Sequence, residues 1–172
     1  MISREPRTPS LLVLGLGNVL LRDDGFGIQL LRRIAEAYVE EVRVECVDGG
    51  TQGLALLGLL EGREAILVLD AWQQGDAPGT LHLTQDPLAQ PTCRGISAHE
   101  GNATELLAAC SLTGELPRRV TVLGVEPQQL STGIGLTPPV ERSVEEAFST
   151  ACGLIESMLL EIVESMEAKT HA

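Results

Sequence analysis

The feature that most constrains the fold is a repeated alternation of short apolar runs with longer amphipathic segments. The runs at 11–15 (LLVLG) and 65–70 (AILVLD) are short and aliphatic, as is typical of buried strands. Between them, residues 27–41 carry apolar side chains at helical spacing, and residues 42–47 predict another strand. Strands that alternate with helices in this way form parallel sheets, because each crossover helix packs back onto the sheet.

The remaining segments extend the same pattern. Residues 52–62 and 102–112 predict two more helices, residues 118–126 another strand, and residues 138–165 a long final helix. Residues 79–85 alternate in polarity and follow a Pro-Gly turn with no helix before them, which predicts an antiparallel edge strand. We therefore expect a single-domain α/β three-layer sandwich, with a mainly parallel twisted sheet, one antiparallel edge strand and helices on both faces.

The expected domain spans residues 11–166, between a flexible lead-in at 1–10 and a frayed tail at 167–172. A chain of 172 residues, 44% of them hydrophobic, is long enough to bury one core. Its formal net charge of −12 argues against nucleic acid and membrane surfaces as partners. The lead-in lacks the apolar segment of a signal peptide and no apolar run is long enough to span a membrane, so we expect a cytoplasmic protein.

Acidic residues gather where the predicted strands end, and ligands of open α/β sheets bind outside those carboxyl ends. Asp24 follows the first strand, residues 48–51 the second, Asp70 the third and Glu126 the last parallel strand, while His99 lies in the loop before a helix. Two carboxylates and one imidazole, Asp24, Asp70 and His99, can bind a borderline metal or perform acid-base chemistry.

Each candidate also has a structural interpretation. Asp24 can cap the first helix, Asp70 can cap the loop behind its strand, and His99 can be a hydrogen-bonding histidine. Asp23 either assists Asp24 or only caps the helix. Asp48 is either a turn residue before two glycines or an alternative catalytic acid near the same cleft.

Two better-known sites fit poorly. Gly15 and Gly17 match the dinucleotide pattern G-x-G-x-x-G, but Leu20 stands at the third glycine. The aspartates that follow would repel a diphosphate, so dinucleotide binding is disfavoured. The stretch HEGNA (99–103) begins like the zinc motif H-E-x-x-H, but Ala103 replaces the second histidine and rules that site out.

The chain has only three histidines, so few imidazoles are available to a metal. We expect His82 at the surface of the edge strand and His171 in the frayed tail. The four cysteines form no C-x-x-C pair, which predicts reduced, mostly buried thiols. His99 is therefore the imidazole that the sequence associates with the acids.

A series of motifs, in order and over nearly the whole chain, resembles the endopeptidases that mature nickel-iron hydrogenases. The motifs are LVLGLGNVLLRDDGFG (12–27), DGGT (48–51), LVLDA (67–71), GDAPGT (75–80), ISAHEGN (96–102), TGELPRRVTVLGVEP (113–127) and GIGLTPPV (133–140). One departure is local: Glu100 is followed directly by Gly101, which can shift the start of the next helix.

The resemblance implies a twisted sheet flanked by helices. It also implies removal of a short C-terminal peptide from the hydrogenase large-subunit precursor after nickel has been inserted. The family's two metal-contacting acids fall on Asp24 and Asp70, and its histidine falls on His99. Its substrate-recognition loop falls on Asp48, Gly49, Gly50 and Thr51.

On this hypothesis the enzyme holds no tight metal of its own, and nickel arrives with the precursor. Either the nickel or a carboxylate activates the attacking water. Two alternatives remain: a self-contained zinc hydrolase using the same three residues, and a nickel-checking chaperone that binds the precursor without cutting it.

Overall fold

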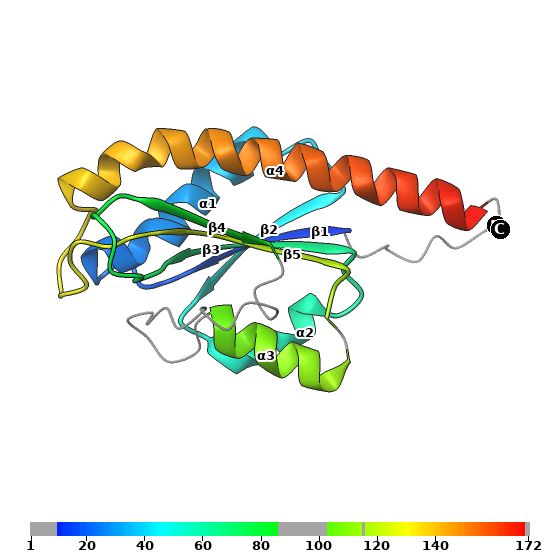
Figure 1. Ribbon diagram of the computed structural model, residues 1–172, viewed down its shortest axis with the longest axis horizontal. Coiled ribbons are helices and arrows are strands. Elements are labelled where there is room, and N and C mark those ends of the chain that lie inside the picture. The colour runs from blue at the N-terminus through cyan, green and yellow to red at the C-terminus, as the bar shows by residue number, and fades with distance from the viewer. Residues whose placement is uncertain (1–9, 86–102, 115, 171–172) are drawn as a thin grey trace.

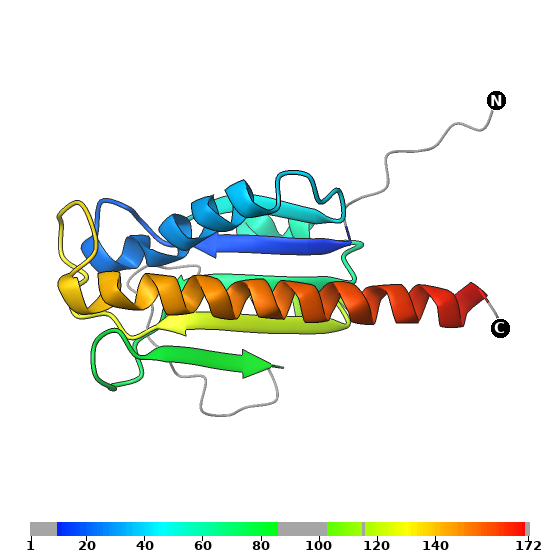
Figure 2. The ribbon, with the colours of Figure 1, turned by 90° about the horizontal axis from the view of Figure 1, so that it is seen from above.

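The computed structural model describes residues 10–85, 103–114 and 116–170. Their five strands form one sheet in the order β2-β1-β3-β5-β4. All neighbouring pairs are parallel except β4 and β5, and in Figure 2 the arrow of β4 points against those of β1 and β5. The strands are β1 (Leu11–Leu16), β2 (Val44–Gly50), β3 (Ala65–Ala71), β4 (Leu81–Gln85) and β5 (Arg119–Val125). The predicted antiparallel edge strand is thus confirmed.

Helices cover both faces of the sheet, as the sequence predicted. In Figure 1, α1 (Phe26–Ala37) and α4 (Pro138–Thr170) lie above the sheet. The short α2 (Leu57–Leu60) and α3 (Ala103–Thr113) lie below it, with the 3-10 turn η2 (Gly53–Leu56) leading into α2. The three-layer α/β architecture is therefore confirmed.

Three helices differ in length from their predictions, and the first of them, α1, ends at Ala37 although helical spacing continues to residue 41. The helix predicted over 52–62 is only a 3-10 turn and one short α-helical segment, since glycines interrupt it and glycine disfavours helix interiors. The final helix continues beyond residue 165 to Thr170, and so includes much of the segment predicted to fray. It projects past the amino ends of the parallel strands, as Figure 2 shows.

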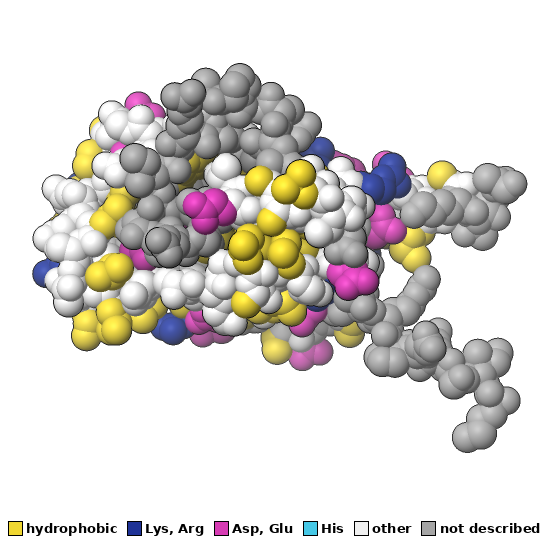
Figure 3. All heavy atoms as spheres, turned by 90° about the horizontal axis from the view of Figure 1, so that it is seen from below, with side chains coloured by type: hydrophobic (Ala, Val, Ile, Leu, Met, Phe, Trp, Pro, Cys, Tyr) yellow, Lys and Arg dark blue, Asp and Glu magenta, His cyan; other side chains and the backbone are white. Residues whose placement is uncertain are grey.

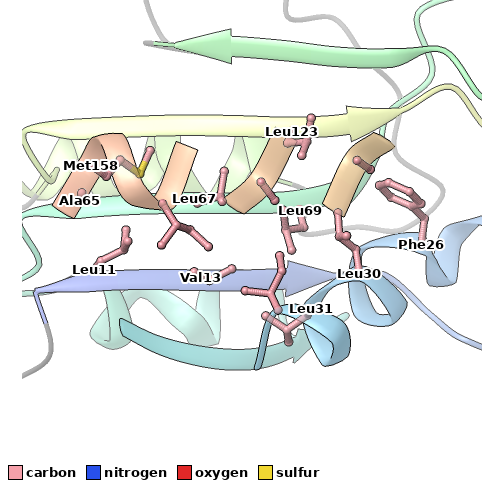
Figure 4. Close-up of a cluster of buried hydrophobic side chains, with 14 of the residues drawn as sticks. Leu11, Val13, Phe26, Leu30, Leu31, Ala65, Leu67, Leu69, Leu123 and Met158 are labelled. Carbon is pink, nitrogen blue, oxygen red and sulfur yellow. The ribbon is translucent and has the colours of Figure 1, made fainter. Parts of the chain in front are cut away.

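Strands β1 and β3 are entirely buried because each of their faces packs against helices. Successive side chains point to opposite faces, so Leu11, Val13, Leu67 and Leu69 pack with α1 and α4. Figure 4 shows this cluster, which Leu30 of α1 joins. The alternate positions of the same strands pack with α2 and α3, and they include Leu12, Leu14, Ile66 and Val68.

The surface carries scattered apolar side chains. Figure 3 shows the face formed by α2 and α3, where hydrophobic side chains reach the surface in several places. Leu54 of η2 and Leu112 of α3 are among the exposed apolar residues. Within the described ranges, no helix combines the length and apolarity needed to cross a membrane.

Candidate functional site

The turn after β1 fixes the position of Asp24. Gly17 has φ +122, and a Cβ at this position would collide with the carbonyl oxygen of Asp24, so the turn requires glycine. The Asn18 amide donates to Asp24 Oδ2 at 2.7 Å, and Asp24 is fully buried. The N-cap of α1 is Gly25, with no side-chain cap. Asp24 therefore does not cap this helix, and that structural interpretation is wrong.

Asp70 lies at the carboxyl end of β3, next to β1 in the sheet. It is 3% exposed, and the Ala71 amide donates to its Oδ1 at 2.8 Å. The turn that carries Asp24, η1 (Arg22–Gly25), contacts β3. Helix α1 begins so close to both strands that a Cβ on Gly27 would collide with the backbone of β1 and β3. The structure thus brings Asp24 and Asp70 to the same edge of the sheet.

Asp23 has a different role from its neighbour. Its carboxylate accepts four hydrogen bonds: from the amides of Gln128, Gln129 and Thr137 and from the Thr137 hydroxyl, at 2.7–2.9 Å. These donors belong to the loop between β5 and α4, and Asp23 itself is fully buried. Asp23 therefore ties this loop to the β1 turn. It does not cap α1, and both of its carboxylate oxygens already accept hydrogen bonds from the loop.

The predicted recognition segment, Asp48, Gly49, Gly50 and Thr51, lies at the end of β2 on the other side of β1. Asp48 is exposed, and its Oδ1 accepts a hydrogen bond from the Gly50 amide at 3.1 Å. The carbonyl of Gly50 in turn accepts a hydrogen bond from the Gly17 amide at 3.0 Å. Asp48 therefore shapes the turn, and the segment adjoins the turn of Asp24.

His99, the third candidate, lies outside the described residues, as do Glu100 and His171. The association of His99 with Asp24 and Asp70 remains a prediction.

His82 contradicts its predicted surface position, because its side chain is only 13% exposed. Its Nε2 lies 3.1 Å from Glu126 Oε2, and its ring packs edge-on against Trp72 with centroids 5.9 Å apart. Polar and apolar residues alternate in β4, but the apolar Leu83 is the exposed residue and the polar His82 faces inward.

Glu126, just after β5, is nearly fully buried. The amides of Gln74 and Gly75 donate to its two oxygens at 2.7 and 3.2 Å. Burial by itself would raise the pKa of Glu126. The hydrogen bonds from these amides, from His82 and from the Asp76 amide outweigh burial and hold the pKa below its usual value. Sequence analysis placed Glu126 at this edge, but it missed the pairing with His82.

A groove of about 540 Å³ adjoins the β1 turn, between α1 and the start of α4. Its apolar lining includes Leu20 and Ile134, which are 57% and 82% exposed. Arg32 and Arg33 of α1 also line it, and Arg33 pairs with Glu145 at 2.7 Å. The groove is thus an accessible, partly apolar surface next to the turn that carries Asp24.

Comparison with known proteins agrees with this architecture. Residues 28–154 match the family described as hydrogenase maturation protease. The Hydrogenase 2 maturation protease of Escherichia coli (strain K12) is 34% identical over 155 residues, which cover 89% of this chain and 94% of that protein.

Two solved structures extend the likeness to three dimensions. The hydrogenase maturating endopeptidase HybD from E. coli has a TM-score of 0.68 at 35% identity, covering 86% of this chain and 93% of the other. The NiFe hydrogenase maturation protease HybD from Thermococcus kodakarensis has a TM-score of 0.65 at 25% identity, covering 84% and 97%. The agreement in sequence along most of both chains, together with the shared fold, shows that this chain belongs to the hydrogenase maturation protease family.

Proposed function

We propose that this protein is a cytoplasmic endopeptidase that removes the C-terminal extension of a nickel-iron hydrogenase large-subunit precursor once nickel has been inserted. Family membership supports a protease of hydrogenase maturation. The observation that carries the site assignment is the pair of buried carboxylates, Asp24 and Asp70, at the ends of neighbouring parallel strands. This edge is where α/β sheets bind their ligands.

In this proposal nickel belongs to the substrate. Asp24, Asp70 and His99 offer two oxygens and one nitrogen, a donor set that nickel accepts. The precursor supplies the remaining ligands, so the protease docks productively only on a nickel-loaded precursor. The incomplete donor set thereby acts as a checkpoint that protects other proteins from cleavage.

Hydrolysis requires a water molecule that loses a proton as it attacks the peptide carbonyl. Either the precursor's nickel or one of the carboxylates activates this water. The Asn18 amide holds Oδ2 of Asp24, which fixes the direction of the carboxylate. Asp48 is the alternative acid, because it is exposed at the end of the strand beside β1.

The precursor is proposed to lie along the surface on either side of the Asp24 turn. On one side the segment 48–51 provides backbone groups and the Asp48 carboxylate. On the other, the groove with Leu20 and Ile134 accepts apolar side chains of the precursor. Burial of exposed apolar side chains next to the scissile bond would supply binding energy for docking.

To test this proposal, the protein is incubated with large-subunit precursor that is either loaded with nickel or nickel-free, and the mass of the precursor is measured over time. Only the loaded form is expected to be shortened. Asp24→Asn and His99→Ala should abolish the cleavage. Glu61→Gln, which removes an exposed charge just before β3, at the opposite end of the sheet from Asp70, should leave it unchanged.

Each alternative has its own outcome. Cleavage of the nickel-free precursor would contradict the checkpoint and favour the self-contained zinc hydrolase. Binding of loaded precursor with no change in its mass would favour the chaperone. Full activity of both Asp24→Asn and His99→Ala would refute the site assignment.

A further inference from the structure

A second set of nitrogen and oxygen donors lies at the same edge of the sheet, beyond β3. Asp76 of the β3–β4 loop, His82 of β4 and Glu126 after β5 each offer one atom, and these atoms all lie within 4.8 Å of one another. We propose that these three side chains bind a divalent metal ion of the borderline class, Zn²⁺ or Ni²⁺. The ligands are one ring nitrogen and one oxygen from each carboxylate.

Two of the donors are already held at the spacing that a metal needs. His82 Nε2 lies 3.1 Å from Glu126 Oε2. Tetrahedral ligands with zinc bonds of about 2.0–2.1 Å lie about 3.3 Å apart, so a small movement admits the ion. The amides of Gln74 and Gly75 fix Glu126, and the edge contact with Trp72 restrains the imidazole.

Asp76 completes the set from the solvent side. One of its carboxylate oxygens lies within 4.8 Å of the ligand atoms of His82 and Glu126, and its side chain is 62% exposed on the loop between β3 and β4. This carboxylate can therefore turn toward the ion without disturbing the core. The exposed side leaves room for water as a further ligand, which matches an open, exchangeable site.

The charges of the cluster favour a cation. Among the residues that the structure describes, His82 is the ion-pair partner of both Asp76 and Glu126, and no lysine or arginine pairs with either acid. The two carboxylates carry negative charge that a divalent ion neutralises. Magnesium and calcium fit less well, because they prefer an all-oxygen shell of six or more ligands.

The bound ion would join three segments near the candidate site. The loop that carries Asp76 begins immediately after β3, the strand of Asp70. Backbone hydrogen bonds already link this loop to the end of β5: the Trp72 amide donates to the Val125 carbonyl and the Gly79 amide to the Glu126 carbonyl. A metal here would reinforce that link. The inference does not depend on the proposed proteolysis.

The test titrates Zn²⁺ into the full chain by isothermal calorimetry. Because Asp24, Asp70 and His99 offer a similar donor set, the background carries Asp24→Asn and His99→Ala. One Zn²⁺ per chain is expected to bind in this background. Adding His82→Gln or Asp76→Asn should weaken that binding by about tenfold or more. Adding Glu61→Gln, which removes a distant exposed charge, should leave the affinity unchanged.

A spectroscopic readout checks that His82 itself is a ligand. Zn²⁺ should shift the ring ¹⁵N resonances of His82 in the same background. Amide NMR spectra verify that each variant is folded, and the exposed Asp76 provides a test if His82→Gln fails to fold. The proposal is overturned if the background binds no Zn²⁺, if binding survives Asp76→Asn at full affinity, or if the His82 ring does not respond. Precursor cleavage is measured separately, so failure of either proposal is recognised on its own.

Discussion

Two acidic regions at one edge of the sheet are built in the same way. In the turn after β1, Asp23 is enclosed by donors from the β5–α4 loop, and Asp24 beside it has a different set of contacts. Beyond β3, Glu126 is enclosed by the amides of Gln74 and Gly75, and it holds His82. In each region one buried carboxylate accepts several backbone hydrogen bonds that hold a loop in place. The side chain beside it, Asp24 or His82, is proposed to contact a ligand.

The regions differ in the side chain that lies beside the loop-holding carboxylate: it is Asp24 in the first region and His82 in the second. Asp23 and Asp24 are both fully buried, so burial alone does not tell the structural acid from the candidate catalytic one. The structural role of Asp23 is seen from the origin of its donors, because groups of the distant β5–α4 loop donate to both of its carboxylate oxygens. The second region presents an imidazole and an exposed carboxylate, which suit a metal ion better than peptide hydrolysis.

The largest expected effect separates the two neighbouring aspartates. Asp24→Asn keeps an oxygen that can accept the Asn18 amide, so the fold should persist. It removes the negative charge proposed to engage nickel or water, and cleavage should fall at least about 100-fold. Single-turnover cleavage of nickel-loaded precursor measures the rate, with Glu61→Gln as the control. A rate near that of the unmodified protein would remove Asp24 from the catalytic site.

Asp23→Ala should lower the stability of the fold, whereas Asp24→Asn should lower the rate of cleavage. The change leaves the amides of Gln128, Gln129 and Thr137 without their acceptor, and the free energy of unfolding should fall by about 3 kcal/mol. Urea denaturation measures this loss. Thr137→Val removes only the hydroxyl bond and should cost about 1 kcal/mol. Equal stability of Asp23→Ala and the unmodified protein would end the distinction between the two aspartates.

A smaller effect tests how closely α1 approaches the strands that carry the site. Gly27→Ala places a methyl group against the carbonyl oxygens of Leu16 and Leu69, so the free energy of unfolding should fall by about 2 kcal/mol. Gly58→Ala is the matched control: no heavy atom lies within 4 Å of the added carbon, and this residue lies in the short helix α2. That variant should be neutral or slightly stabilised. Thermal unfolding of both variants decides, and equal melting temperatures would contradict the close approach.

The sequence predicts those features that local pattern controls. The structure contains the predicted strands β1 and β3, the amphipathic helix α1 and the antiparallel strand β4. These elements could be predicted because the spacing of apolar residues within a short segment indicates a strand or a helix. The family resemblance supplies Asp24 and Asp70, and the topology places both at one edge. His99 stays a prediction, since it lies outside the described residues.

What the sequence does not predict depends on contacts between distant segments. Asp23 and Thr137 are 114 residues apart in the sequence, and His82 and Glu126 are 44 apart. A local sequence pattern therefore cannot predict either hydrogen bond. The contacts of His82 with Glu126 and Trp72 keep its side chain mostly buried, although it is a polar residue on an edge strand. The short α2 also departs from its prediction, because apolar spacing indicated a longer helix than its glycines permit.

The smallest expected effect comes from the second region. His82→Gln removes one partly buried hydrogen bond to Glu126, so the free energy of unfolding should fall by about 1 kcal/mol in metal-free buffer. Cleavage of nickel-loaded precursor should stay within about twofold of the unmodified rate, because Asp24 and Asp70 are unaffected. Added Zn²⁺ should raise the melting temperature of the unmodified chain more than that of the variant. A loss of cleavage as large as that of Asp24→Asn, in a protein that is still folded, would show that the two regions act as one site.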